Sequence, residues 1–262
     1  MKPLFLFTLI SLVGFTDVSP AQKTELTELQ KAHQSVFLLR VPSVKSTGTG
    51  VLVGREKTEG GYKYKAVSAY HVLGEAIEKA LTDKTNINLE FMFQQSFHGD
   101  PLRKHVEATI EWAVEKYDWV CFSFLLEEKM HCCEIATEEE FQQIQPFENI
   151  YGVGCDDGKG QSLKIGVIGS THNHEYYGEF QTLAPQEWNR NPNKFFRAYM
   201  NIWLGSSGGG IFNKDGKLIG IFIAINILNP IKMPVPHGTI CLKAHVIKSA
   251  TDAIKDFIRI EE

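Results

Sequence analysis

A serine in a glycine-rich stretch is the first residue of this chain that could carry chemistry. Ser207 lies within Gly205 to Gly210, whose small residues let the backbone turn sharply and present a hydroxyl group. A serine hydroxyl becomes a nucleophile when a base takes its proton, and the base needs a partner that fixes its tautomer. A histidine and an aspartate are therefore expected elsewhere in the chain. On its own, the stretch is equally typical of a tight turn.

His71 and Asp118 are the candidates for base and partner. His71 follows a β-branched run and precedes a helical pattern, a position that can aim an imidazole into a cleft. Asp118 directly precedes the apolar run that begins at Trp119. Alone, His71 is typical of a hydrogen-bonded histidine at a helix start, and Asp118 of a turn or a strand cap. The presence of all three residues in one chain favours the catalytic interpretation.

Two groups of short apolar runs must position these residues. Each group holds six strand-like runs bounded by turn residues. The runs are 36–41, 50–53, 62–68, 87–93, 106–114 and 119–125 in the first group, and 150–154, 163–168, 195–202, 210–213, 218–225 and 239–242 in the second. They predict an all-β fold of two packed six-stranded antiparallel β-barrels, with the site between them. The first barrel takes residues 35–126 and the second, with a C-terminal helix, takes 147–262.

Helical and irregular segments complete this organisation. Residues 22–34 predict a short N-terminal helix, residues 72–81 a helix directly after His71, and residues 246–258 an amphipathic helix that caps the second barrel. The polar residues 127–146 predict a linker that is partly helical. Residues 55–61 predict a turn, and Asp215-Gly216 predicts a tight hairpin.

Together these motifs resemble the chymotrypsin-fold (trypsin-like) serine proteases, closest in style to the bacterial HtrA and glutamyl-endopeptidase branches. The resemblance rests on residues 68–72, on Asp118 before its strand and on residues 205–209, and it covers about residues 35–258. It implies that Ser207 is the nucleophile, His71 the general base and then acid, and Asp118 the residue that orients His71. It also implies an oxyanion hole formed by the N–H groups of Gly205 and Ser207. No PDZ domain is expected after the C-terminal helix.

The resemblance also bears on activation and specificity. Ser206 stands where the animal digestive enzymes have an aspartate that pairs with a newly cut N-terminus, so we expect that switch to be absent. No aspartate lies at the expected pocket floor and no histidine lies on 219–225, so we expect an uncharged residue at P1, the substrate residue before the cleaved bond. The predicted pocket residues are Asn201, Ile202, Ile223, Ala224 and Ile225, with 239–242 as a further wall.

Composition limits the possible partners. The net charge is -4 and the sequence pI is about 6.2, with basic and acidic residues intermixed, so no basic stripe predicts nucleic-acid binding. We expect protein or peptide substrates and no metal or organic cofactor. The motif His172-Asn173-His174 is more typical of a solvated turn than of a metal site. Five cysteines without C-x-x-C spacing define no zinc site, and one or two disulfides would be possible after export.

The N-terminus predicts export. Residues 1–21 combine a lysine, an apolar run of about a dozen residues and a small-residue exit, which is typical of a secretory signal peptide and short for a membrane span. An uncleaved anchor or a buried strand is the alternative for this segment. We therefore expect a secreted or periplasmic serine endopeptidase. An inactive binding module on the same fold and an intracellular defence or signalling protease are the alternatives.

Overall fold

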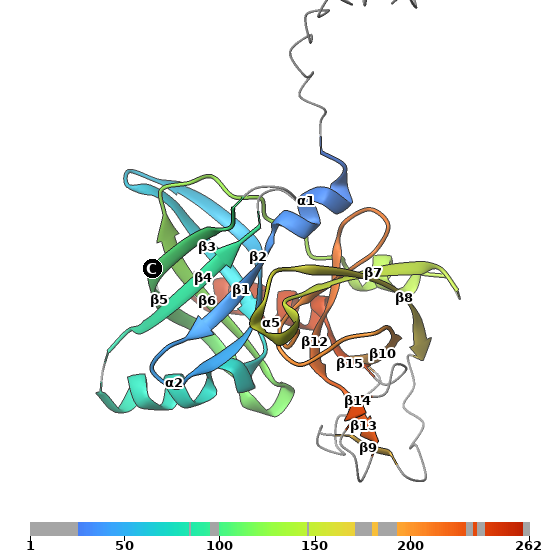
Figure 1. Cartoon of the computed structure of the whole chain (residues 1–262). Helices are drawn as coiled ribbons and strands as arrows, with labels where there is room; N and C mark the ends of the chain where they lie inside the picture. The colour runs from blue at the N-terminus through green and yellow to red at the C-terminus, as the bar shows by residue number, and fades with distance from the viewer. Residues whose placement is uncertain are drawn as a thin grey trace, which may run out of the picture.

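The computed structural model describes residues 26–83, 85–94, 100–145, 147–170, 180–182, 193–228, 233–234 and 239–258. Two β-barrels lie side by side, joined by the linker (Figure 1). The expected signal peptide at 1–21, the start of the expected N-terminal helix and the motif at 172–174 lie outside the described residues.

The first barrel is closed and antiparallel, with the strand order β1-β2-β3-β6-β5-β4. Its strands are β1 (Val36–Val41), β2 (Ser46–Thr58), β3 (Gly61–Ser68), β4 (Ile87–Phe93), β5 (Leu102–Val114) and β6 (Trp119–Leu126). Aromatic rings fill its interior: the ring centroid of Phe91 lies 4.6 Å from those of both Phe37 and Phe124. The predicted six strands are confirmed. The turn predicted at 55–61 lies at Glu59 and Gly60 and is shorter than expected, because β2 continues to Thr58.

The second barrel is also closed, with the order β10-β15-β12-β11-β7-β8. Its strands are β7 (Asn149–Gly154), β8 (Ser162–Ser170), β10 (Phe195–Tyr199), β11 (Gly210–Phe212), β12 (Leu218–Ala224) and β15 (Thr239–Lys243). The strand predicted at 195–202 ends earlier, at Tyr199, and the chain then runs irregularly to the glycine-rich stretch. A small sheet of β9 (Phe180–Thr182), β13 (Asn226–Leu228) and β14 (Met233–Pro234) was not predicted.

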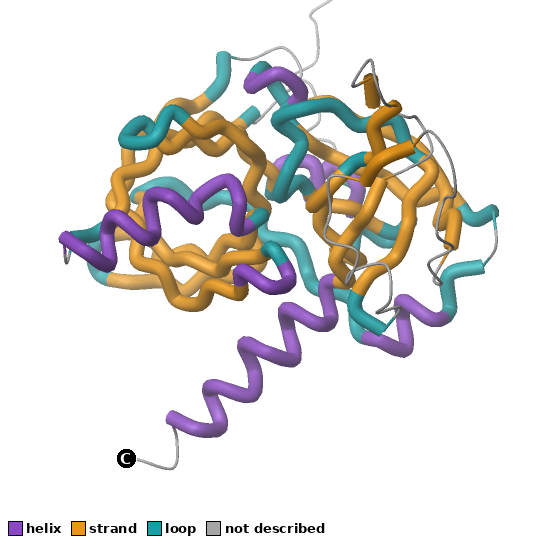
Figure 2. Tube along the Cα trace, turned by 90° about the horizontal axis from the view of Figure 1, so that it is seen from below, coloured by secondary structure: helices purple, strands orange, loops and turns teal. Residues whose placement is uncertain are grey.

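Helices lie at the ends and junctions of the barrels. They are α1 (Glu28–Gln34), α2 (Tyr70–Asp83), α3 (Glu138–Gln142) and α5 (Ala244–Ile258), with the short 3-10 turns η1 (Glu115–Tyr117) and η2 (Asp156–Gly158). Within α5, Ala244 and Ile247 are buried, and the helix then extends away from the barrels (Figure 2). The expected cap on the second barrel is therefore limited to the first turns of α5. No described helix is long and apolar enough to cross a membrane.

Side chains and backbone join the two barrels. Residues of both contribute to one buried cluster, including Val72 from the first barrel and Val153 and Phe212 from the second. The linker is held along the second barrel, where Leu218 N–H donates to Glu134 O and Ala136 N–H donates to Leu218 O. These contacts hold the segments at the junction between the barrels firmly, and the candidate site lies there.

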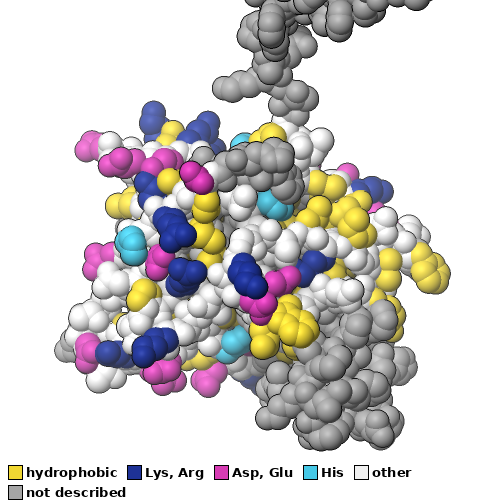
Figure 3. Space-filling model, in the orientation of Figure 1, with side chains coloured by type: hydrophobic (Ala, Val, Ile, Leu, Met, Phe, Trp, Pro, Cys, Tyr) yellow, Lys and Arg dark blue, Asp and Glu magenta, His cyan; other side chains and the backbone are white. Residues whose placement is uncertain are grey.

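On the face shown in Figure 3, acidic and basic side chains are interspersed.

Candidate active site

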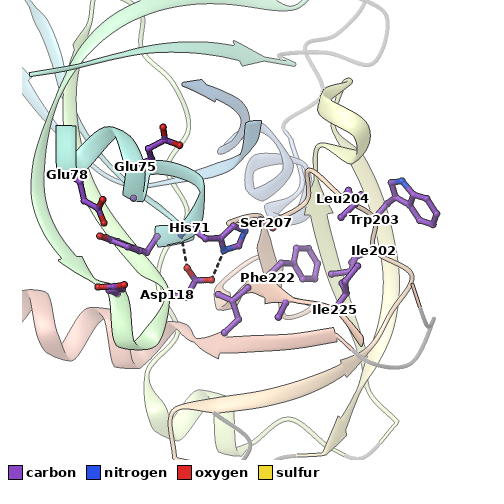
Figure 4. A pocket seen from close by; sticks show the side chains of 15 residues that line it. His71, Glu75, Glu78, Asp118, Ile202, Trp203, Leu204, Ser207, Phe222 and Ile225 are labelled. Carbon is purple, nitrogen blue, oxygen red and sulfur yellow. Dashed lines mark hydrogen bonds and ion pairs between the residues drawn. The ribbon is translucent and has the colours of Figure 1, made fainter. Parts of the chain in front are cut away.

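His71 and Asp118 are joined by two hydrogen bonds. His71 lies in the first turn of α2, and its backbone N–H donates to Asp118 Oδ1 over 2.7 Å. Its ring Nδ1 lies 2.7 Å from Asp118 Oδ2. A carboxylate oxygen accepts, so this contact places the imidazole proton on Nδ1 and leaves Nε2 able to accept one. Figure 4 shows both bonds, with the ring lying beside Ser207.

Local structure presents the Asp118 carboxylate to the start of α2. Asp118 follows η1 and adopts a left-handed conformation with φ 54°, which aspartate tolerates better than most residues. The first N–H groups of a helix lack partners within the helix and favour negative charge. Asp118 satisfies one of them while its side chain is only 7% exposed, whereas the His71 side chain is 50% exposed. The aspartate is therefore buried and fixed, and the imidazole reaches into solvent.

Ser207 lies across the barrel junction, in the loop between β10 and β11. Ser207 and His71 line the same cavity of about 570 Å³. Among the described residues, no hydrogen bond joins the Ser207 hydroxyl to the imidazole. Catalytic hydrogen bonds are often long in the absence of substrate and tighten when it binds. The two side chains predicted to act together are thus brought to one cavity.

Two N–H groups of this loop are left without an acceptor. Ser206 N–H donates to Trp203 O, Gly208 N–H to Phe222 O and Gly209 N–H to Ser206 O. Within the part of the chain that the structure describes, Gly205 N–H and Ser207 N–H have no such partner. These are the two groups predicted to form the oxyanion hole.

Glycine is required at two positions of the loop. Gly205 has φ +90°, and a Cβ atom there would lie 2.5 Å from Cys155 O. Gly208 has φ +83°, and a Cβ atom there would lie 2.2 Å from Thr49 O on the first barrel. The glycines therefore serve a left-handed backbone that packs directly against both barrels.

Ser206, beside the candidate nucleophile, is buried and donates a hydrogen bond to Asp156 Oδ1 in η2. Asp156 Oδ2 accepts from Ser162 Oγ at 2.9 Å and forms a 3.0 Å ion pair with Lys164 Nζ on β8. Burial alone would raise the pKa of Asp156, but the hydrogen bonds from Ser206 and Lys164 and the lysine charge outweigh it and lower the pKa. Sequence reasoning did not find Asp156.

Other residues give the cavity an apolar side and an acidic side (Figure 4). Ile202, Trp203, Leu204, Phe222 and Ile225 lie on the apolar side, and Glu75 and Glu78 lie on the other. Tyr70, Glu115, Ile223 and Ala224 also line the cavity. Burial and then the charges of Glu115 and Glu78 raise the pKa of Tyr70. The phenol group is therefore neutral at physiological pH.

Four of the five predicted pocket residues line this cavity: Ile202, Ile223, Ala224 and Ile225. Asn201, the predicted floor, is exposed and is not among the described residues that line it. Along this extended segment Met200 and Ile202 are buried while Asn201 and Trp203 are exposed, because alternate side chains point to opposite sides. Trp203 and Leu204, beyond the predicted set, also reach the cavity.

The cysteines offer no competing nucleophile. All five are free. Burial raises the pKa of Cys121 and Cys132 to about 11, and that of Cys133 and Cys155 to about 12. A protonated thiol is a poor nucleophile, so these are structural cysteines. No group of His, Cys, Asp and Glu side chains suited to a metal ion occurs among the described residues.

Comparisons with known proteins agree with this architecture. A family model described as a trypsin-like peptidase domain matches residues 48–221. A search of curated protein sequences finds no significant match.

Solved structures share the fold at low sequence identity. Deg5 is 16% identical with a TM-score of 0.57, covering 85% of this chain and 89% of that structure. The HtrA-type protease AlgW with tripeptide is 14% identical with a TM-score of 0.61, covering 87% of this chain and 62% of that one. The MamO protease domain from Magnetospirillum magneticum is 15% identical with a TM-score of 0.55, covering 84% and 97%. These likenesses concern the fold.

Proposed function

The chain belongs to the trypsin-like peptidase family, a family of serine endopeptidases that act on proteins or peptides, and we propose that it cleaves its substrates with the triad His71, Asp118 and Ser207 through an acyl-enzyme. The observation that carries this proposal is the pair of 2.7 Å bonds that hold His71 on Asp118 beside the cavity that Ser207 lines. The chemistry needs a nucleophile, a base of fixed tautomer and a place for negative charge. The site supplies groups suited to all three.

In the proposed reaction, Ser207 Oγ attacks the carbonyl carbon of the scissile peptide bond while His71 Nε2 takes its proton. The negative charge that develops on the carbonyl oxygen is bound by Gly205 N–H and Ser207 N–H. The intermediate then collapses, and His71 gives its proton to the leaving amine. Water, deprotonated by His71, then attacks the acyl carbon, and His71 returns that proton to Ser207 Oγ as the bond to the acyl group breaks. Asp118 keeps the Nδ1 proton in place and stabilises the imidazolium that forms at each stage.

The apolar wall of the cavity supports an uncharged P1 residue. Ile202, Phe222 and Ile225 lie on this wall. A charged P1 side chain packed against this wall would lose water and find no opposite charge among the side chains of the wall, which is unfavourable. The proposed enzyme therefore prefers an apolar or small P1 residue, which peptide-library cleavage profiling would reveal.

We also propose that the protein is exported, so that it acts outside the cytoplasm. The composition of residues 1–21, with a lysine followed by an apolar run and small residues, supports this. N-terminal sequencing of the protein recovered from its native cell would test it. A mature N-terminus near residue 22 is expected, and a chain that begins at Met1 would contradict export by signal cleavage.

Substitution of the candidate nucleophile tests the catalytic proposal. Ser207→Ala removes the attacking oxygen, and such a loss costs about a million-fold in rate. We expect no labelling by a fluorophosphonate probe and no casein hydrolysis, with an unchanged circular dichroism spectrum. Ser43→Ala, at an exposed serine, is the matched control and should label as the wild type does. If the wild-type protein takes up no probe, the binding-module alternative replaces the catalytic one.

A further inference from the structure

We propose that Thr49, on β2 of the first barrel, is a positioning residue that keeps the N–H groups of Gly205 and Ser207 available to the reacting carbonyl oxygen. The proposal rests on the proposed function, because it concerns the oxyanion hole of that reaction. It adds a residue from the opposite barrel that makes no contact of its own with the reacting atoms. Thr49 is fully buried and acts through four hydrogen bonds.

The loop can be described as four successive peptide planes. In a trans peptide the C=O and N–H groups point in opposite directions, so fixing one group aims the other. The C=O of Leu204 accepts from Asp157 N–H at 2.7 Å, which turns Gly205 N–H away from η2. The C=O of Ser206 accepts from Gly209 N–H at 2.8 Å, which turns Ser207 N–H away from Gly209 N–H. These two planes carry the proposed oxyanion donors.

Thr49 holds the two planes that alternate with them. Its hydroxyl donates to Gly205 O at 2.8 Å, and its backbone N–H donates to Ser207 O at 2.8 Å. Those planes are bound on their other side as well, through Ser206 N–H and Gly208 N–H. When a peptide plane rotates, the backbone angles on both sides of it change, so the neighbouring planes move as well. Thr49 therefore restrains both donor planes by fixing the planes next to them.

The first barrel holds Thr49 itself rigidly. Thr49 pairs with Leu38 of β1, and the Thr49 carbonyl accepts from Ser68 Oγ at 2.7 Å. Its hydroxyl accepts from Cys155 N–H at 3.0 Å, just after β7. A hydroxyl has a single proton to donate, so accepting from Cys155 leaves that proton for Gly205 O. The side chain thus links the first barrel, the end of β7 and the nucleophile loop.

The backbone bond to Ser207 O survives substitution at position 49, whereas the hydroxyl bonds do not. Removing the hydroxyl leaves the Cys155 N–H and the Gly205 C=O without their partner, so the 205–206 plane loses one of its two restraints. Misplacement of a catalytic group by about 1 Å can cost about a hundred-fold in rate. The effect should therefore appear in the chemical step rather than in binding.

Two variants isolate the hydroxyl. Thr49→Ala and Thr49→Ser both lose the methyl group, but only Thr49→Ala loses the hydroxyl. We expect the maximal rate of fluorophosphonate labelling, per folded molecule, to fall about 10- to 100-fold in Thr49→Ala and less than about threefold in Thr49→Ser. The probe concentration at half-maximal rate should change less than about twofold in both. Thr49→Val, which keeps the shape but lacks the hydroxyl, should behave as Thr49→Ala does.

Ser123→Ala is the control for lost stability. Ser123 is buried in β6 and donates to Glu111, away from the loop, so its loss should lower the unfolding temperature without changing the labelling rate. Equal maximal rates in Thr49→Ala and Thr49→Ser would overturn the proposal, as would failure of both hydroxyl-free variants to fold while Thr49→Ser folds. An unlabelled wild type would instead contradict the proposed function, so the two failures are distinguishable.

Discussion

The two barrels hold their parts of the candidate site with different kinds of bond. On the first barrel, one side chain does the holding: both oxygens of the Asp118 carboxylate are bound to His71, at 2.7 Å each. On the second barrel, the Ser207 loop is held through its backbone, by partners that include Thr49, Asp157 and Phe222. The first arrangement depends on one residue type, and the second is spread over many contacts.

This difference predicts how each half responds to substitution. A single change at Asp118 alters both bonds to His71 at once, and no other hydrogen bond holds the His71 ring among the described residues. A single change around the Ser207 loop removes one restraint among several and leaves the others in place. A single substitution should therefore cause a large loss of activity on the first barrel, and smaller losses of different size on the second.

Asp118→Asn tests the first barrel's half of the site. Its expected effect is the largest, followed by those of Gly205→Ala and Asp156→Asn. The amide nitrogen can donate to Nδ1, which stabilises the tautomer whose Nε2 already carries a proton. His71 then fails to accept the Ser207 proton, and a loss of about ten-thousand-fold in kcat is expected. Casein hydrolysis at saturating substrate measures it.

The matched control is Asp83→Asn, at an exposed aspartate at the end of α2. It should leave kcat unchanged, which separates the effect of the carboxylate at position 118 from a general change of charge. A loss in Asp118→Asn of less than about tenfold would mean that His71 is not oriented by this aspartate, and the contrast between the barrels would disappear.

Gly205→Ala tests the second barrel's half of the site at one of the two proposed oxyanion donors. The added Cβ would lie 2.5 Å from Cys155 O and would strain a residue whose φ is +90°. The loop must shift, so one oxyanion donor is misplaced, and removal of such a donor costs about a hundred- to a thousand-fold in kcat. Kinetics on casein, with thermal unfolding as a parallel measurement, would test this.

Gly60→Ala provides the matched control, since a Cβ there has no neighbour within 4 Å. It should leave both kcat and the unfolding temperature close to the wild-type values. If Gly205→Ala retained wild-type kcat while losing stability, the Gly205 N–H would have no role in catalysis. The loop would then present the nucleophile and nothing else.

The sequence predicted the barrels and the candidate residues of the site, but not the contacts that hold those residues. Strand runs of alternating or apolar character predicted both barrels, and residue type singled out His71, Asp118 and Ser207. The structure brings these three to one junction, while their catalytic roles stay a prediction. The turn expected at 55–61 is limited to Glu59 and Gly60, because the polar residues Arg55 to Lys57 lie in a long hairpin strand, where polar side chains are tolerated.

Thr49 and Asp156 were missed because nothing local marks them. Thr49 reaches Gly205 across a sequence separation of 156 residues, and Asp156 reaches Ser206 across 50. A threonine in a strand and an aspartate in a turn have ordinary local roles, and only the closed barrels bring them to the loop. A local signal was Gly48, directly before Thr49, because a Cβ atom there would lie 3.0 Å from the backbone oxygen of Ser207.

Asp156→Asn has the smallest expected effect. It tests whether the contact of Asp156 with the Ser206 side chain is one of the restraints on the Ser207 loop. The amide oxygen of this variant would still accept from Ser206, but the ion pair with Lys164 would be lost, so kcat should fall about tenfold or less. The free energy of unfolding at pH 7 should fall by about 1.5 to 3 kcal/mol, the usual contribution of a hydrogen bond to a charged group. Urea unfolding at several pH values would measure it.

The pH dependence gives this last prediction its sign. The pKa of Asp156 is lowered in the folded state, so its carboxylate stabilises the protein above the unfolded-state value of about 3.9. That stabilisation is lost as the pH falls below this value towards the folded pKa. The difference between wild type and Asp156→Asn should therefore be full at pH 7 and shrink below about pH 4, while Asp100→Asn, at an exposed aspartate, should show little difference at either pH. A difference independent of pH would mean that Asp156 supports the loop through its shape and hydrogen bonds rather than its charge.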